Sequence, residues 1–208
     1  MKFEIPKIYP ITDVGLSGIS HTEQARRFID GGAKIVQFRE KHAAPLDWYD
    51  DVCEAINLCR QNKVISIIND RIDIAMAASA DGVHLGQTDL PPSAARRILG
   101  DMAIIGYSTH TIEQVTKAIK LDVDYIALGP VFPTKTKQNP DSVVGLELIR
   151  QVRAITRGMP LVAIGGIDLA NAGSVFDAGS DSIALISALV GDAPKIAQQT
   201  NALITQFV

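Results

Sequence analysis

The chain has 208 residues, the length of one domain, and 47% of them are hydrophobic, so a sizeable core can form. Its formal net charge of −3, with both signs dispersed, argues against a nucleic-acid surface or a basic membrane-binding face. No apolar run approaches the ~20 residues of a membrane span, and the amino-terminal residues lack the pattern of a signal peptide. We therefore expect a single domain over residues 1–208 in the cytoplasm.

Eight short runs rich in β-branched residues recur along the chain, each followed by a polar or glycine-rich turn and an amphipathic stretch. The runs are Ile8–Ile11, Ile35–Phe38, Val64–Ile68, Gly82–Leu85, Ala103–Gly106, Tyr125–Leu128, Leu161–Ile164 and Ile183–Ile186. Several are continuous rather than alternating, which indicates strands covered on both faces, as in a parallel sheet.

The segments between the runs have helical spacing. One apolar stripe has the i, i+3, i+4, i+7 pattern of a helix with a buried face and consists of Tyr49, Val52, Cys53, Ile56 and Cys59. The same spacing recurs over Ile112–Ile119 and Ile149–Ile155, and Thr111 and Asp168 stand at N-cap positions. Strands that alternate with helices predict right-handed βαβ units, and eight of them close into a single (β/α)₈ TIM barrel. A doubly wound open sheet is the alternative fold.

Two cysteines, Cys53 and Cys59, lie in the same predicted helix. Their spacing places them roughly 120° apart around the helix axis, which does not favour a disulfide. The spacing also matches no metal-binding pattern. We expect two free thiols that face the core in a reducing compartment.

The chemically distinctive residues follow the carboxyl ends of the apolar runs. In a closed parallel barrel these ends meet on one face, where (β/α)₈ active sites are built. Gln37, Arg39 and Lys41 lie on one side of their strand, and two cations with an amide suit a diphosphate. The alternative for the cations is a surface charge pair with Glu40.

Further along the chain, Asn69 and Ser108 follow two other runs and suit hydrogen bonds to a phosphate or a heterocycle. Asp70 and Asp89 are hard oxygen ligands that suit Mg²⁺. A helix cap for Asp70 and a turn or cap for Asp89 are the alternatives. His84 lies within an apolar run, where a hydrogen-bonded barrel histidine is favoured over a catalytic one.

Two glycines and a serine follow the last two runs. Gly165 and Gly166, with Ser187, are expected to offer backbone N–H groups to a phosphate monoester. A tight turn without a ligand is the alternative for the glycines. The polar segment Pro133–Asp141 suits a mobile lid from which Lys137 approaches an anion, and a solvated charge run is its alternative.

Six segments together resemble the thiamine-phosphate synthase family over essentially the whole chain. They are Gln37–Lys41, Ile68–Asp73, Ala80–Gln87 with Asp89, Gly129–Lys137, Ala163–Ile167 and Leu185–Ala188. Tyr107 departs from the smaller aliphatic residue that is common in the family. The resemblance implies a transferase that joins a hydroxymethylpyrimidine diphosphate to hydroxyethylthiazole phosphate by dissociative substitution, releasing pyrophosphate, with Mg²⁺ as cofactor.

The resemblance also implies a role for each matching residue. The pyrimidine diphosphate would be bound by Gln37, Arg39, Lys41, Asn69, Ser108 and Lys137, of which Arg39, Lys41, Ser108 and Lys137 would be catalytic. The thiazole phosphate would be bound by Thr134, Lys135, Thr136, Gly166, Ile186 and Ser187. Asp70 and Asp89 would hold the metal. The implied partners are these small molecules and, by family habit, further copies of the chain.

Three other functions compete with this interpretation. A thiazole tautomerase of the same fold does acid–base chemistry without a diphosphate and generally lacks the combined Arg, Lys and Asp set. A non-catalytic phosphate-sensing barrel needs the glycine turn but not the paired carboxylates. A sugar-phosphate isomerase uses the phosphate loop but leaves Arg39, Lys41 and Lys137 without a task.

Overall fold

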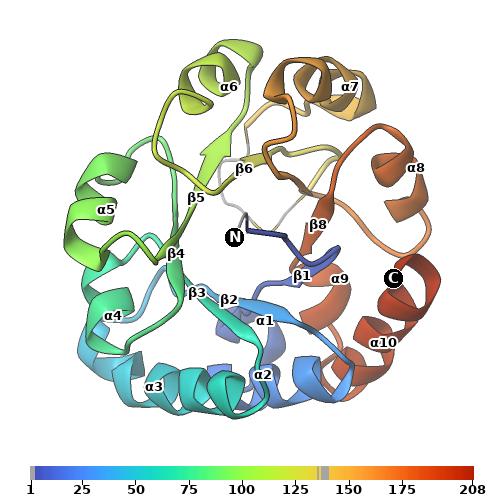
Figure 1. The fold of residues 1–208 in the computed structure, drawn as a ribbon. Helices are drawn as coiled ribbons and strands as arrows, with labels where there is room; N and C mark the ends of the chain where they lie inside the picture. Colours follow the sequence, from blue (N-terminus) through green and yellow to red (C-terminus); the bar gives the residue numbers. More distant parts are fainter. Residues whose placement is uncertain (1–2, 135, 137–140) are drawn as a thin grey trace.

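The computed structural model describes residues 3–134, 136 and 141–208 and shows a ring of helices around a parallel sheet (Figure 1). The strands are β1 (Ile8–Pro10), β2 (Ile35–Phe38), β3 (Ile65–Asn69), β4 (Gly82–Leu85), β5 (Ile104–Thr109), β6 (Tyr125–Leu128), β7 (Leu161–Ile164) and β8 (Ser182–Leu185). Each pairs in parallel with its neighbours in the order β1-β8-β7-β6-β5-β4-β3-β2.

The sheet closes on itself between β1 and β2. Ile11 forms a parallel bridge with Gln37, and the Thr12 amide donates to the Gln37 carbonyl at 2.9 Å. The predicted (β/α)₈ barrel is therefore confirmed, and the open doubly wound sheet is not formed.

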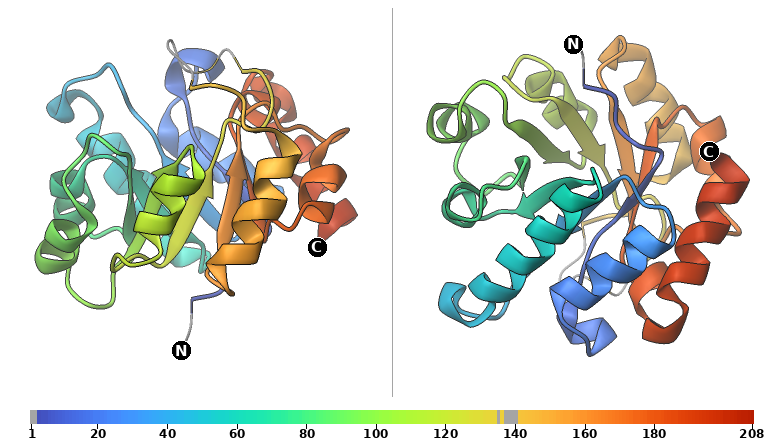
Figure 2. Two further views of the ribbon diagram at one scale, coloured as in Figure 1. Left: turned by 90° about the horizontal axis from the view of Figure 1, so that it is seen from above. Right: turned by 60° about the horizontal axis from the view of Figure 1, so that its bottom comes forward.

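Helices follow the strands around the outside of the barrel (Figure 2). They are α1 (Val14–Ser17), α2 (His21–Asp30), α3 (Pro45–Gln61), α4 (Ile72–Ala77), α5 (Pro92–Leu99), α6 (Ile112–Ala118), α7 (Gly145–Thr156), α8 (Ala172–Asp177), α9 (Ser187–Val190), the 3₁₀ turn η1 (Ala193–Lys195) and α10 (Ile196–Phe207). Within the described ranges, none of them combines the length and apolarity that a membrane crossing requires.

One predicted helix start is confirmed and the other is wrong. Thr111 caps α6, where its hydroxyl accepts the Gln114 amide. The Asp168 carboxylate instead accepts the Ala170 and Asn171 amides in a local turn, and α8 begins only at Ala172. An Asp that bonds its own loop in this way gives the same local sequence signal as an N-cap.

The core has two layers because side chains alternate across each strand. In β2, Phe38 packs outward against the helices, whereas Ile35 and Gln37 face the barrel interior. The apolar interior layer comprises Tyr9, Ile11, Ile35, Ile67, Tyr125, Ala127, Val162 and Ala184. The segment before β1 approaches the barrel from the amino ends of the strands (Figure 2). Phe3 in this segment packs against the interior layer, with its ring centroid 6.2 Å from that of Tyr125.

Both cysteines lie in α3 as free thiols, as predicted. Cys59 is buried in the outer layer, but Cys53 is only partly buried. Trp48 and Ala55 take part in the buried face instead, so the face of α3 that contacts the barrel is rotated relative to the predicted stripe.

Three aspartates fix the amino ends of neighbouring strands. Asp81, Asp124 and Asp181 stand just before β4, β6 and β8, and their carboxylates accept the backbone amides of Ser66, Ile105 and Leu161, each at 2.8 Å. Each carboxylate therefore ties an even-numbered strand to its odd-numbered neighbour. These bonds lie on the face opposite the predicted site, where a (β/α)₈ barrel is stabilised rather than active.

Candidate active site

A cavity of about 430 Å³ opens at the carboxyl ends of the strands, and all eight strands contribute to its lining. Among the residues singled out from the sequence, those that line it include Gln37, Arg39, Lys41, Asn69, Asp70, His84, Asp89, Ser108, Thr134, Thr136, Gly165, Gly166, Ile186 and Ser187. Lys135 and Lys137, which the sequence also singled out, lie outside the described residues. Barrel closure thus gathers the predicted set around one basin.

Arg39 follows β2 and is held at the rim of the cavity. Its guanidinium donates to the Asp13 carboxylate at 2.7 Å, and its backbone amide donates to the Thr12 hydroxyl at 3.1 Å. Glu40 is not its partner, since that carboxylate accepts the His42 and Ala43 amides. The alternative of a surface pair with Glu40 is therefore wrong, and the Arg39 side chain is 15% exposed and fixed in direction.

Two carboxylates converge beside Lys41. The Lys41 ammonium donates to Asp70, and Asp89 accepts the Gly86 amide at 2.7 Å. Burial, together with the neighbouring Asp70 carboxylate, raises the pKa of Asp89. The two carboxylates lie next to each other in the cavity. Two negative charges at such short range repel, which favours either protonation of one carboxylate or a cation bound between them.

Asp70 does not form the helix cap that was its alternative role, whereas Asp89 does form a turn. The residue before α4 is Arg71, which makes no side-chain cap, so the helix-cap alternative for Asp70 is wrong. The turn alternative for Asp89 is confirmed by its bond to Gly86. No group of three or more His, Cys, Asp or Glu suited to a metal occurs among the described residues. A pair of carboxylates still fits Mg²⁺, which keeps several waters and takes substrate oxygens as its other ligands.

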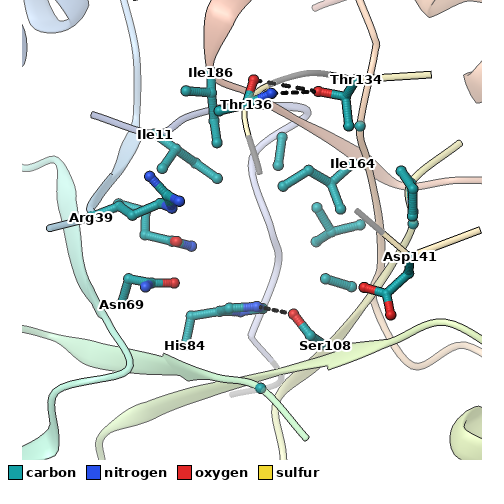
Figure 3. Close-up of a pocket in the computed structure, with 18 of the residues that line it drawn as sticks. Ile11, Arg39, Asn69, His84, Ser108, Thr134, Thr136, Asp141, Ile164 and Ile186 are labelled. Carbon is teal, nitrogen blue, oxygen red and sulfur yellow. Dashed lines mark hydrogen bonds between the residues drawn. The ribbon is translucent and has the colours of Figure 1, made fainter. Parts of the chain in front are cut away.

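Asn69 ends β3 instead of following it, and its side chain is directed toward the cavity (Figure 3). The residue is 7% exposed, and its amide nitrogen has no hydrogen-bond partner among the described residues. A buried donor without a partner is costly, so this amide is suited to an acceptor that a ligand supplies.

A row of polar side chains forms the floor of the cavity. Gln37 donates to the Tyr9 hydroxyl at 3.0 Å, and the Tyr9 and Tyr125 hydroxyls are 2.9 Å apart. His84 bonds Tyr125 through Nδ1 at 3.0 Å and Ser108 through Nε2 at 2.8 Å. The prediction of a hydrogen-bonded barrel histidine is thus confirmed.

Burial determines the charge of these groups. It lowers the pKa of His84 to about 4, so the imidazole is neutral near pH 7. It also raises the pKa of Tyr9 and of Tyr125, so both phenols keep their protons. Sequence reasoning missed the two tyrosines. The available signal was a polar aromatic residue within each of two otherwise aliphatic strands.

The opposite wall of the cavity is apolar. Ile164 lies across the cavity from Arg39 and Asn69, and Ile186 lies near Thr136 (Figure 3). Val162 and Ala184 extend this wall toward the floor. The cavity therefore has a charged half built from β2 to β5 and an apolar half whose wall consists of strand residues from β6 to β8. The loop after β6 adds the polar side chains of Thr134, Thr136 and Asp141 to the apolar half (Figure 3).

The turn after β7 requires glycine. Gly166 has φ 66°, and a Cβ there would lie 2.6 Å from the Pro133 carbonyl oxygen. Gly165 has φ 102°, and its Cβ would lie 2.5 Å from that of Pro130. The turn can thus pack against the loop after β6, which brings Gly166 and Thr134 to the same part of the cavity.

Comparison with known proteins gives a consistent result. The family model described as thiamine monophosphate synthase matches residues 8–189. The chain is 42% identical over 202 residues to the thiamine-phosphate synthase of Chloroflexus aurantiacus, covering 96% of this chain and 93% of that one. It is 47% identical over 184 residues to that of Methanospirillum hungatei, covering 88% and 89%. The solved thiamine phosphate pyrophosphorylase from Pyrococcus furiosus superposes with a TM-score of 0.86 at 36% identity, covering 96% and 94%.

Proposed function

This chain belongs to the thiamine monophosphate synthase family, and from that premise we propose that it makes thiamine phosphate. Its substrates would be 4-amino-2-methyl-5-hydroxymethylpyrimidine diphosphate and hydroxyethylthiazole phosphate, and the second product would be pyrophosphate. The observation that carries the proposal is the two-sided cavity, which holds cations and paired carboxylates on one side and an apolar wall on the other.

The charged half suits the pyrimidine diphosphate. Arg39 offers a fork of donors to phosphate oxygens, and Lys41 adds a compact positive charge. Asn69 supplies an amide donor that has no partner within the part of the chain that the structure describes. Asp70 and Asp89 would hold Mg²⁺, which when bound neutralises charge on the diphosphate oxygens.

The apolar half suits the thiazole phosphate. Ile164 and Ile186 would pack against its ring, while Thr134, Thr136 and the turn at Gly166 would bind its phosphate, with Ser187 and Lys135 completing the set. Because the two halves face each other, the substrates would be placed side by side for reaction.

The reaction breaks a C–O bond to the diphosphate and forms a C–N bond to the thiazole nitrogen. The electron-rich aminopyrimidine stabilises a cation at its exocyclic carbon, so the leaving group can depart before the nitrogen attacks. That nitrogen carries no proton, so no general base is needed. The residues therefore act by stabilising the departing diphosphate, which is the task we assign to Arg39, Lys41, Ser108 and Lys137.

The apolar wall has a second task in this mechanism. A carbocation at the exocyclic carbon reacts with water as well as with the thiazole nitrogen. Val162, Ile164 and Ile186 would exclude water from that side of the cavity. Neutral His84 would supply no acid or base near pH 7, because its pKa lies at about 4.

The competing functions account for less of the cavity. A tautomerase or a sugar-phosphate isomerase would use the turn at Gly166 but would leave Arg39, Lys41 and the carboxylate pair without a ligand. A phosphate sensor would leave Asp70 and Asp89 unexplained. All of these groups lie in one cavity, so a function that uses all of them is favoured.

The test is direct synthesis. The purified protein is incubated with both substrates and Mg²⁺, and thiamine phosphate and pyrophosphate are measured. We expect both products in equal amounts, loss of synthesis with a chelator, and recovery when Mg²⁺ is added back. Binding of thiazole phosphate without product would contradict the proposal and favour a sensor, and metal-independent rearrangement of a thiazole would favour a tautomerase.

A further inference from the structure

Five polar side chains form one unbroken line of hydrogen bonds across the barrel. The line runs from Gln37 to Tyr9, Tyr125, His84 and finally Ser108, with each donor and acceptor 2.8–3.0 Å apart. Its residues come from five different strands, and its last member lines the cavity (Figure 3). A line of this kind has a direction, because each hydroxyl carries a single hydrogen.

The direction follows from counting hydrogens, starting at Gln37. The Gln37 amide nitrogen can only donate, so the Tyr9 oxygen accepts from it. The other partner of the Tyr9 hydroxyl among the described residues is Tyr125, which must take the Tyr9 hydrogen. By the same count, the Tyr125 hydrogen is left for His84 Nδ1.

The count then fixes the tautomer of His84. Nδ1 accepts, so a neutral imidazole carries its hydrogen on Nε2 and donates it to the Ser108 oxygen. Were the line reversed beyond Tyr9, the Tyr9 hydrogen would lack an acceptor among the described residues. If His84 were doubly protonated, the Tyr125 hydrogen would likewise lack an acceptor among the described residues. Tyr9 and Tyr125 are 1% and 0% exposed, so neither hydrogen can bond to bulk water.

The strand register provides the space for this line. His84 on β4 is level with Gly106 on β5, and Gly106 is level with Tyr125 on β6. A Cβ at Gly106 would lie 2.1 Å from Tyr125 Cζ and 2.5 Å from His84 Nδ1. The two rings meet and stack across the intervening strand because that position has no side chain.

We propose that Tyr9, Tyr125 and His84 are positioning residues that make the Ser108 hydroxyl a hydrogen-bond donor toward the substrate. Because Ser108 already accepts from His84, its own hydrogen is directed to a ligand in the cavity. The ligand group it suits is an anionic oxygen, and under the proposed function, on which this inference rests, that oxygen belongs to the departing diphosphate. The donor would strengthen as negative charge develops there.

The first test measures the tautomer directly and needs no activity. With ¹⁵N-labelled histidine, the nitrogen chemical shifts of each imidazole show which nitrogen carries the hydrogen. The signal of His84 is assigned by its loss in His84→Gln. We expect the Nε2–H tautomer in the free protein. The Nδ1–H tautomer would overturn the proposal, since Ser108 would then donate to His84 instead of the substrate.

The second test breaks the line at one atom. Tyr125→Phe removes the donor to His84 and should lower kcat about tenfold, while the KM of each substrate changes less than about threefold. The His84 nitrogen signals should shift away from those of a single fixed tautomer. Tyr49→Phe is the matched control, because its hydroxyl bonds the Ala77 carbonyl on the outside of the barrel. Its kinetics should equal those of the wild type.

The outcomes separate this proposal from the proposed function. An unchanged kcat in Tyr125→Phe would overturn the positioning role even if the tautomer is as expected. A wild-type protein that makes no thiamine phosphate would refute the function and leave the tautomer result standing. Should Tyr125→Phe fail to fold, the wild-type tautomer still decides the direction of the line.

Discussion

Arg39 shows how one residue is prepared for an anion before any ligand binds. Its guanidinium is fixed by Asp13, and the Asp13 carboxylate also accepts the Leu16 amide at the start of α1. The loop after β1 thus orients the cation that follows β2. A fixed donor fork loses little conformational entropy on binding, which favours recognition of a diphosphate.

We predict that Arg39→Ala lowers kcat by roughly 10²–10³, because one donor to the developing charge is lost. The fold should survive, since the residue lies at the rim of the cavity and not in the apolar core. Steady-state kinetics and a melting curve check both statements. Arg26→Ala is the control, as Arg26 is 51% exposed and pairs only with Glu23 of its own helix among the described residues. Turnover within a few-fold of wild type in Arg39→Ala would remove Arg39 from the mechanism.

The sequence predicted individual site residues well where their chemistry was unusual for their position. Arg39, Asp70 and Gly166 could be found because charged groups and glycines at strand ends are informative. Tyr9 and Tyr125 gave only a weak signal, because a tyrosine in a strand is ordinary and its hydrogen-bond partner is set by the register of strands far apart in sequence. Hydrogen bonds between side chains depend on three-dimensional closure that no local pattern contains.

At the level of secondary structure, the apolar runs located all eight strands. Four have the predicted bounds, β2, β4, β6 and β7, because hydrophobicity ends where the strand ends. β5 was predicted to end at Gly106 but continues to Thr109, and β3 includes Asn69. Both extensions carry polar side chains that line the cavity. Because polar residues are also typical of loops, the sequence pattern predicted that each strand ended too early.

The aspartates before β4, β6 and β8 each bind a backbone amide of the neighbouring strand. Asp124 allows the contribution of such a bond to stability to be measured. Its carboxylate accepts the Ile105 amide at 2.8 Å and the Arg96 guanidinium at 2.9 Å. We predict that Asp124→Asn lowers the free energy of unfolding by about 2 kcal/mol, because a charged carboxylate is replaced by a neutral amide oxygen, which is a weaker acceptor for the Ile105 amide and the Arg96 guanidinium. Urea unfolding measures this change.

Asp122→Asn is the matched control for that measurement. Asp122 also contacts Arg96, at 3.2 Å, but its side chain is 65% exposed, against 30% for Asp124. An exposed pair contributes about 0.5 kcal/mol or less. Equal losses in the two variants would show that the strand amide is not the important partner.

For the whole molecule, the alternation of strands and helices predicted the barrel, but not how it closes. Among the described residues, the backbone pairing between β1 and β2 consists of the bridge of Ile11 with Gln37 and the bond from the Thr12 amide to the Gln37 carbonyl. Such a seam depends on the tilt and stagger of all strands together. Likewise, no sequence pattern predicted that Phe3, in the segment before β1, would pack against the interior layer at the amino ends of the strands.

Enclosing His84 inside the barrel has a consequence for the stability of the whole protein in acid. The unfolded chain protonates this histidine near its ordinary pKa of 6.5, whereas the folded protein does so only at about 4. Between these values the unfolded state binds more protons, so stability falls as the pH falls and is fully present above the unfolded pKa. His21, whose pKa is also lowered by burial, acts in the same sense.

We predict that the free energy of unfolding falls by about 2 kcal/mol more in the wild type than in His84→Gln between about pH 7 and about pH 5. Urea unfolding at both pH values measures the difference. Comparing the two proteins cancels the contribution of Asp89, whose raised pKa acts in the opposite sense. If His84→Gln lost as much stability as the wild type, the buried imidazole would not be the group that resists protonation, and the acid sensitivity would belong to another part of the barrel.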